Sequence, residues 1–207
     1  SEVGQRMPQH GNVIDAAKAA GVKFIAYTSV LNAQDNAMAL AAEHKATEDM
    51  LAASGIPHTL LRNGWYSENF TATIEQDLET GQRFGASGTG QYATASRQDF
   101  AEAAAVVLAG GHDGEILELA GDEAYTMADY AALVTDLSGK KLAYIDMPEA
   151  AFTEALIGAG LPEAFATILV DCDMKAAQGA LFDDSKTLST LIGRPTTPIA
   201  ETIKAAL

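Results

Sequence analysis

The stretch most suited to chemistry is the segment NGWYSE at residues 63–68. Asn63 supplies an amide that donates and accepts hydrogen bonds, Gly64 lets a ligand approach the backbone, and Tyr66 combines a flat ring with a polar tip. The other members are Trp65, Ser67 and Glu68. An apolar run at 57–62 precedes the segment and is typical of a strand, and open α/β sheets bind ligands where their strands end. The alternative is a strand-to-helix turn whose aromatic side chains fill a core.

A histidine stands on the helix expected at about residues 38–54. His44 is followed by Lys45, Thr47 and Glu48, and the ordinary pKa range of histidine suits proton donation near neutral pH. The alternative is a hydrogen-bonded structural histidine. The remaining histidines are His10, His58 and His112. They share no metal-ligand spacing with Glu or Cys, so the sequence predicts no metal site.

Composition limits the classes of partner. Thirteen Lys and Arg against 28 Asp and Glu give a formal charge of −15 over 207 residues, which repels nucleic acid and anionic membranes. The apolar segments end well before the roughly 20 residues that a membrane span needs. No secretory leader is recognisable, so we expect a cytoplasmic protein. Cys172 is the single cysteine, and it is expected to be a small buried side chain rather than a nucleophile.

Strands and helices alternate along the first part of the chain. Strands are expected at 23–29, 57–62, 115–121 and 141–147, and helices at 38–54, 70–79, 97–110 and 126–138. Ser96 with Asp99 predicts a capping box, and Thr126 a further helix start. The turn GASGTG, residues 85–90, resembles a phosphate loop only superficially, and a hairpin is expected there instead.

This alternation predicts the fold class. Crossover units up to about residue 146 indicate a parallel α/β sheet, and the residues after it are expected to be mostly helical. We therefore expect residues 1–146 to carry the sheet with interleaved segments of a second domain. Residues 147–207 are expected to form a smaller helical lobe.

Four segments carry a resemblance to a known family. They are GVKFIAYTS, HKATEDMLAASGIPHTLLRNGWYSENF, ELAGDEAYTMADYAALVTDLSGK and GALFDDSKTLSTLIGRPTTP. Together they resemble the NmrA-like branch of atypical short-chain dehydrogenases, and most closely the type 2 NAD(P)H:quinone oxidoreductases. The Tyr-x-x-x-Lys pair of ordinary short-chain dehydrogenases is missing, and His44 stands where related reductases carry a lysine.

The resemblance implies a partial Rossmann-type domain that holds NADPH and a C-terminal lobe, with a small-molecule quinone between them. It places the loop 63–68 beside the nicotinamide and implies further cofactor contacts at Ser1 and Gln91, while Trp65 is equally suited to a core. The family's glycine-rich loop has no counterpart here, so the first βαβαβ half is expected to be absent. The activity is therefore expected of the full-length protein.

Two classes of function follow from the resemblance. The first is hydride transfer from NADPH to a quinone, which makes weak demands on the protein because the nicotinamide carries the hydride. The second is an NmrA-type regulator that senses redox state by binding dinucleotide without turnover. A homo-oligomer is compatible with both.

Overall fold

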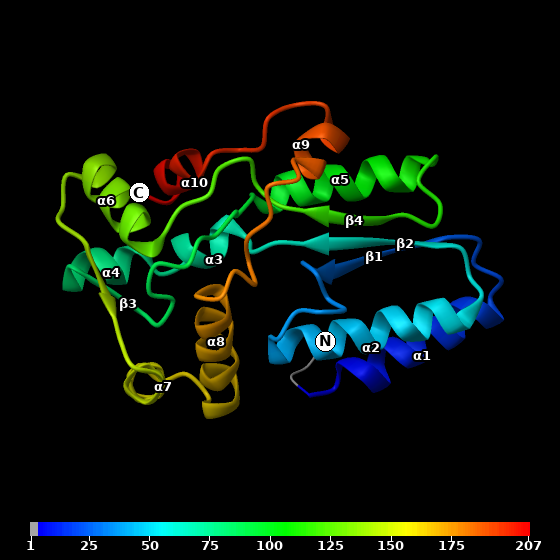
Figure 1. Cartoon of the computed structure of the whole chain (residues 1–207), viewed down its shortest axis with the longest axis horizontal. Coiled ribbons are helices and arrows are strands. Elements are labelled where there is room, and N and C mark those ends of the chain that lie inside the picture. Colours follow the sequence, from blue (N-terminus) through cyan, green and yellow to red (C-terminus); the bar gives the residue numbers. More distant parts are fainter. Residues whose placement is uncertain (1–3) are drawn as a thin grey trace.

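The computed structural model describes residues 4–207, and its elements form two groups around two sheets (Figure 1). The strands are β1 (Ile25–Val30), β2 (His58–Asn63), β3 (Gln82–Gly85), β4 (Ile116–Leu119) and β5 (Ala143–Asp146). The helices are α1 (Arg6–Ala19), α2 (Ala39–Ser54), α3 (Ser67–Thr71), α4 (Ile74–Thr80), α5 (Arg97–Ala109), α6 (Met127–Ser138), α7 (Glu149–Gly158), α8 (Glu163–Ala176), α9 (Thr187–Ile192) and α10 (Ile199–Ala206).

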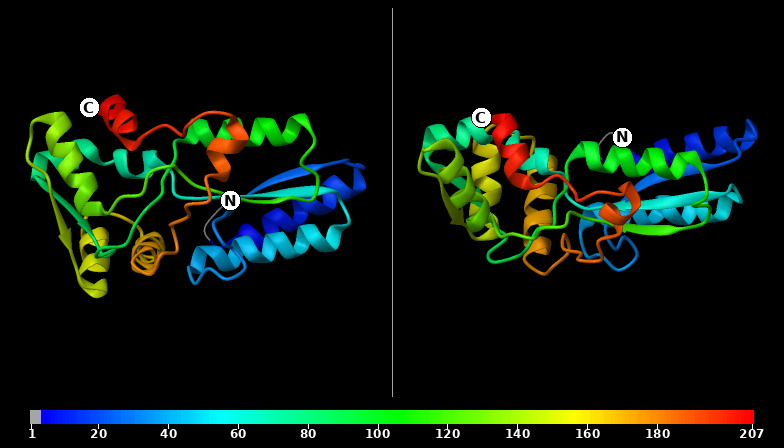
Figure 2. Two further views of the ribbon diagram at one scale, coloured as in Figure 1. Left: turned by 45° about the horizontal axis from the view of Figure 1, so that its top comes forward. Right: turned by 90° about the horizontal axis from the view of Figure 1, so that it is seen from above.

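The larger sheet is parallel, with the strand order β1-β2-β4. Helices α1 and α2 lie on one face, and α5 and α9 lie on the other (Figures 1 and 2). The register aligns Ser29 with Arg62 and Arg62 with Glu118 near the carboxyl ends of the strands. The α/β fold class with parallel strands is confirmed.

Apolar side chains explain how the sheet is covered. Leu61 and Leu119 point toward α5 and pack there with Phe100, Ala103 and Val107. On the opposite face Leu60 packs with Ile14 of α1 and Leu51 of α2. Alternation of side chains along a strand places Leu60 and Leu61 on opposite faces, so both faces of β2 are buried.

Local sequence signals fix several element ends as expected. Ser96 with Asp99 and Thr126 with Asp129 both form complete capping boxes, at the starts of α5 and α6. The helix α2 ends at Gly55, whose φ of 73° is the left-handed conformation that glycine adopts without strain. The helix expected at 70–79 is instead two short helices, α3 and α4.

The glycine-rich turn differs from its prediction. Residues 82–85 form β3, which pairs in parallel with β5 in a separate two-stranded sheet, so the hairpin prediction is wrong. The strand predicted at 141–147 exists but does not join the larger sheet. Parallel pairing requires a long crossover, here through α5, β4 and α6, and a local reading of the turn could not reveal it.

The second group is built from segments far apart in the sequence. The sheet β3-β5 is packed with α4 and α6, α7 pairs with α8, and α10 contacts both α3 and α6. Helix α9 returns to the larger sheet and packs on α5 and β4. One apolar cluster, which includes Val30, Phe70 and Tyr130, is shared by the two groups. The domain boundary at residue 146 stays a prediction, and the chain passes between the groups on both sides of it.

Within residues 4–207, no helix is both long and apolar enough to cross a bilayer. The same part of the chain brings no three His, Cys, Asp or Glu side chains together as a metal site.

Candidate active site

The loop 63–68 lies in the middle of the carboxyl edge of the larger sheet. The backbone N–H of Leu31, just after β1, donates to the carbonyl of Asn63 at 3.1 Å. The N–H of Gly64 donates to the carbonyl of Leu119, the last residue of β4, at 2.7 Å. Both neighbouring strands therefore fix the start of the loop at the position where open α/β sheets bind ligands.

Asn63 carries an unsatisfied buried oxygen. Its side chain is only 4% exposed, its Nδ2 contacts the Tyr66 hydroxyl at 3.4 Å, and its Oδ1 has no hydrogen-bond partner among the described residues. A buried acceptor without a donor typically costs about 1–3 kcal/mol. The atom is therefore suited to receive an N–H or O–H of a ligand, and the carboxamide of a nicotinamide offers such a donor.

Gly64 packs closely against the ends of the neighbouring strands, and its role in cofactor binding stays a prediction. A Cβ atom on Gly64 would lie 3.2 Å from the Leu119 carbonyl oxygen and 3.2 Å from a methyl carbon of Leu31. The protein itself fills this space, so close packing of the strand ends already explains the glycine.

The two aromatic residues of the loop are both packed. Trp65 is half-buried against the cluster shared by the two groups. The Arg97 guanidinium lies 4.5 Å from the centre of the Tyr66 ring, and the Phe100 ring is 5.1 Å away. Tyr66 therefore does not present the free stacking face expected from the sequence, and its hydroxyl beside Asn63 is its feature directed at the candidate site.

The other residues predicted to contact the cofactor differ in whether they already form hydrogen bonds within the protein. Ser67 is fully buried, and its Oγ lies 2.9 Å from the Thr94 hydroxyl. Both carboxylate oxygens of Glu68 accept hydrogen bonds from the backbone N–H of Arg97, at 2.9 and 3.0 Å. Gln91 is exposed, and Ser1 lies outside the described residues. Ser67 and Glu68 thus have structural partners of their own, and a role for any of these four in cofactor binding stays a prediction.

A buried ionic network lies next to the loop, and sequence reasoning missed it. Arg62, which precedes Asn63, donates to Glu48 of α2 from Nε at 3.0 Å and from Nη2 at 2.7 Å. Its Nη1 donates to Glu118 of β4 at 2.8 Å. Glu48 also accepts from Ser29 at 2.6 Å and from Gln34 at 2.9 Å. This network consists of Arg62, its partners Glu48 and Glu118, and the two donors to Glu48, Ser29 and Gln34. It joins β1, β2, β4 and α2 next to the loop.

Charge pairing keeps this network ionised. Burial alone would raise the pKa of Glu48, but hydrogen bonds from Arg62, Ser29 and Gln34 outweigh burial and lower it. The hydrogen bond to Glu48 raises the pKa of Arg62. An arginine that directly follows Leu60 and Leu61 in a strand expected to be buried was the sequence signal that could have revealed a buried carboxylate partner.

His44 lies on α2, one helical turn before Glu48. It is 8% exposed, and its Nδ1 lies 2.8 Å from the Tyr27 hydroxyl. Burial, followed by the nearby charges of Arg6 and His10, lowers the pKa of His44 from 6.5 to about 4. The imidazole is therefore neutral at pH 7. A neutral ring can still donate or accept a hydrogen bond, and a catalytic role of His44 stays a prediction.

The lowered pKa predicts a pH effect on stability. As the pH falls from 6.5 toward 4, the unfolded chain takes up a proton at His44 that the folded chain resists, so the free energy of unfolding falls. His44→Gln should lose less stability than the wild type over this pH interval. Denaturant unfolding at pH 7 and pH 4.5 measures the difference, and an equal loss in both proteins would contradict the assigned pKa.

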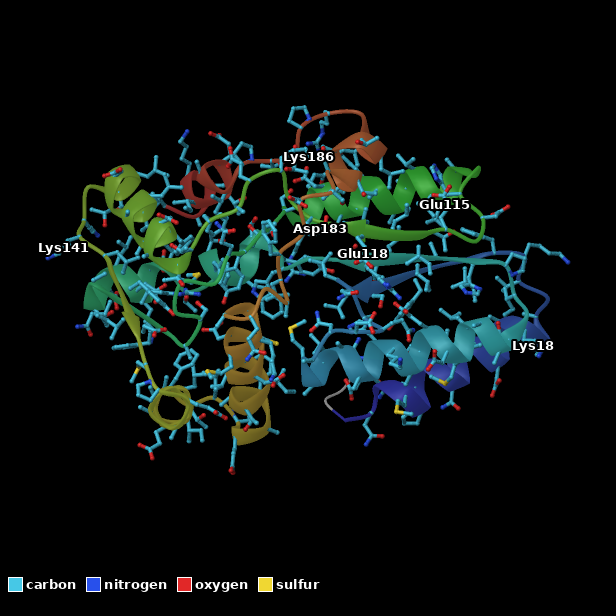
Figure 3. All side chains as sticks on the ribbon, viewed as in Figure 1. Lys18, Glu115, Glu118, Lys141, Asp183 and Lys186 are labelled. Atoms are coloured by element: carbon cyan, nitrogen blue, oxygen red, sulfur yellow. The ribbon has the colours of Figure 1, made fainter. Side chains whose placement is uncertain are left out.

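A cavity of about 360 Å³ opens at the carboxyl ends of β1 and β4. Figure 3 shows Glu118 and Asp183 close together at this end of the sheet. The cavity is lined by Leu31, Asn32, Asp35, Asn36, Ala37, Glu118, Lys175, Gln178, Gly179, Ala180, Phe182 and Asp183. Most of the lining side chains are polar or charged. Leu31 lines the cavity and also packs against Gly64 at the start of the loop.

Comparisons with known proteins reveal a family match and a similar curated protein. The model of the NmrA-like family matches residues 2–192. Quinone oxidoreductase 2 of Escherichia coli (strain K12) is 57% identical over 204 residues, which are 98% of this chain and 71% of that protein.

Two solved structures extend the comparison. An NADPH-dependent quinone oxidoreductase from Escherichia coli, complexed with NADPH, superimposes with a TM-score of 0.96 at 56% identity and covers 99% of this chain and 73% of that one. The triphenylmethane reductase of Citrobacter sp., complexed with NADP(H), superimposes with a TM-score of 0.91 at 34% identity. This match covers 97% of this chain and 71% of that one. The chain belongs to the NmrA-like family.

Proposed function

We propose that the protein is an oxidoreductase that transfers a hydride from NADPH to a quinone. The similarity to quinone oxidoreductase 2, at 57% identity over nearly the whole chain, supports both the reaction and the cofactor. The observation in this structure that carries the proposal is the buried, unpartnered Oδ1 of Asn63 at the carboxyl edge of the sheet.

The loop would hold the nicotinamide end of NADPH, and NADPH supplies the hydride when bound. Asn63 would accept a hydrogen bond through Oδ1, while Leu31 and Leu119 hold its backbone in place. The ionic network behind the loop fixes β2 against α2, which limits movement of Asn63 relative to the ligand.

The quinone is assigned to the cavity beside Leu31. Lys175 and the amide groups of Asn32 and Gln178 can donate hydrogen bonds to quinone oxygens, and Phe182 offers an aromatic surface. The reduced oxygens can take protons from water or from one positioned side chain. Position and orientation are then the main contributions of the protein.

The alternative function, a regulator that binds dinucleotide without turnover, is not favoured. The negative transcriptional regulator NmrA superimposes with a TM-score of 0.65 at 13% identity, which supports the fold alone. A cytoplasmic location and a homo-oligomeric state stay predictions from the sequence. The discriminating experiment mixes the full-length protein with NADPH and a simple benzoquinone. Acceptor-dependent loss of nicotinamide absorbance supports the enzyme, and its absence overturns the proposal.

Removal of the Asn63 side chain should weaken use of the cofactor. Asn63→Ala is expected to raise the Kd for NADPH about fivefold, the effect of about one hydrogen bond. Fluorescence titration of bound NADPH measures this change.

The melting temperature provides the control for Asn63→Ala. The substitution removes an unsatisfied buried acceptor, which offsets the packing that it loses, so the melting temperature should change little. An unchanged Kd together with a clearly lower melting temperature would assign Asn63 to the fold instead.

A further inference from the structure

The glycine-rich turn at residues 85–90 packs closely against α8. A Cβ atom on Gly85 would lie 2.9 Å from Oδ2 of Asp173 in α8, and one on Gly90 would lie 2.4 Å from the carbonyl oxygen of Ala176. Real Cβ atoms do not come this close to other heavy atoms, so glycine at both positions allows the turn and α8 to meet. Packing of α8 therefore accounts for these two glycines of the GASGTG motif.

Hydrogen bonds fasten α8 to the same part of the chain. Oδ2 of Asp173 accepts from the backbone N–H of Ala86 at 3.0 Å, and Oδ1 accepts from the Tyr92 hydroxyl at 3.0 Å. Ala86 is 6% exposed and Tyr92 is 1% exposed, so both donors depend on the carboxylate rather than on water. Both oxygens of Asp173 are thus used to attach α8 to the segment 85–92.

A second aspartate attaches α8 to the group that contains the larger sheet. Oδ2 of Asp171 accepts from the backbone N–H of Ala39, the first residue of α2, at 2.7 Å. A carboxylate is favourable at the amino-terminal end of a helix. Figure 1 shows α8 between α2 and the sheet β3-β5. Asp171 and Asp173 therefore fix α8 on its two sides.

α8 leads directly into the wall of the cavity that is assigned to the quinone. Half of the lining residues come from its last turn and the chain after it: Lys175, Gln178, Gly179, Ala180, Phe182 and Asp183. Farther along, the carbonyl of Leu181 accepts from the N–H of Ala93 at 3.2 Å. Lys175 and Gln178, which can donate to quinone oxygens, thus lie between two attachment points, Asp173 and Leu181.

We propose that Asp173 is a positioning residue for the quinone, because its attachment to the segment 85–92 sets the place of Lys175 and Gln178 at the cavity. The inference rests on the proposed function in that it takes a quinone as the ligand of this cavity. Donors assist a reaction only when they are held at the correct distance and angle. Asp173 is not among the described residues that line the cavity, so it acts through α8.

Steady-state kinetics of the full-length protein with NADPH and a simple benzoquinone test the inference. Asp173→Ala removes both attachments and should raise the KM for the quinone about tenfold, with a smaller change in kcat, because the donors lose their fixed position. Tyr92→Phe removes one attachment and keeps the packing of the ring, so it should raise this KM about threefold. The Kd for NADPH, titrated without quinone, should stay as in the wild type.

Asp173→Asn separates the geometry of the attachment from its charge. The amide oxygen can still accept from the N–H of Ala86, and the amide nitrogen can donate to the Tyr92 hydroxyl. α8 then stays attached without a buried charge, so this variant should keep the KM of the wild type. A KM raised as much as in Asp173→Ala would overturn the inference, because the charge rather than the attachment would then control the site.

Asp146→Ala is the matched control on the other side of the turn. Oδ1 of Asp146 in β5 accepts from the backbone N–H of Gly88 at 2.8 Å and from the Tyr144 hydroxyl at 3.0 Å. The variant removes two hydrogen bonds of an aspartate near the turn, and neither of them involves α8. It should leave the KM for the quinone unchanged. A KM raised equally in Asp146→Ala and Asp173→Ala would overturn the inference, because general loosening of the turn would explain it.

Thermal unfolding separates positioning from a purely structural role. Asp173→Ala leaves two buried donors unpaired and should melt earlier than the wild type, so the kinetics are measured well below each melting temperature. A lower melting temperature with an unchanged KM would assign Asp173 to the fold and overturn the inference. If Asp173→Ala does not fold, the KM of Tyr92→Phe decides in the same way. Failure of the wild type to reduce the quinone would instead contradict the proposed function.

Discussion

Glu48→Ala is expected to lower the free energy of unfolding by about 3–5 kcal/mol, because it leaves the Arg62 guanidinium buried without its main partner. Glu48 is 3% exposed and Arg62 is 7% exposed. Only Glu118 would still pair with the arginine. The hydrogen bonds from Ser29 and Gln34 would be lost as well. Denaturant unfolding measured at pH 7 gives the change directly.

A double variant identifies the cause of this loss. Replacing both partners, as Glu48→Leu with Arg62→Met, removes the uncompensated charge and should recover much of the stability. If the double variant were as unstable as Glu48→Ala, packing around α2 rather than the buried charge would explain the effect. The affinity of the recovered protein for NADPH then reports whether the network also positions Asn63.

Gly121→Ala is expected to disrupt the support of the loop and to destabilise the fold by at least about 3 kcal/mol, since overpacking against rigid backbone belongs to the most costly substitutions. A Cβ atom on Gly121 would lie 1.9 Å from the carbonyl oxygen of Thr94. The segment containing Thr94 pairs with the loop through Tyr66 and Ala95. The substitution must therefore displace backbone that contacts the loop, and both the melting temperature and NADPH affinity should fall.

Gly158→Ala is the control for the glycine prediction. Gly158 is the last residue of α7, and a Cβ atom there would meet nothing within 4 Å. The variant should unfold like the wild type or slightly later, because alanine favours helix. Equal melting temperatures for Gly121→Ala and Gly158→Ala would show that the segment 92–95 moves away from β4 at little cost.

Local signals in the sequence predicted the elements that local physics determines. The capping boxes at Ser96 and Thr126 begin α5 and α6 as expected, because side chain and backbone three residues apart satisfy each other. The apolar runs became β1, β2 and β4, and their parallel order follows from the crossover helices. The loop 63–68 lies at the edge of the sheet where its position after β2 placed it.

Contacts between distant residues were beyond the reach of such signals. Arg62 meets Glu48 and Glu118, which stand 14 and 56 positions away in the sequence. The sequence could not show that Arg97 and Phe100 of α5 pack against the Tyr66 ring, because these residues meet it only in the folded chain. The pKa of His44 depends on burial and on Arg6 and His10 of α1, which only the fold brings near it.

The most direct measurement of the central claim is the rate of NADPH oxidation by the purified full-length protein in the presence and absence of a benzoquinone. We predict rapid loss of nicotinamide absorbance only with the quinone, with one NADPH consumed per quinone reduced and a rate that saturates with both compounds. Tight binding of NADPH with no oxidation above the rate without protein would contradict the account and indicate a dinucleotide-binding regulator.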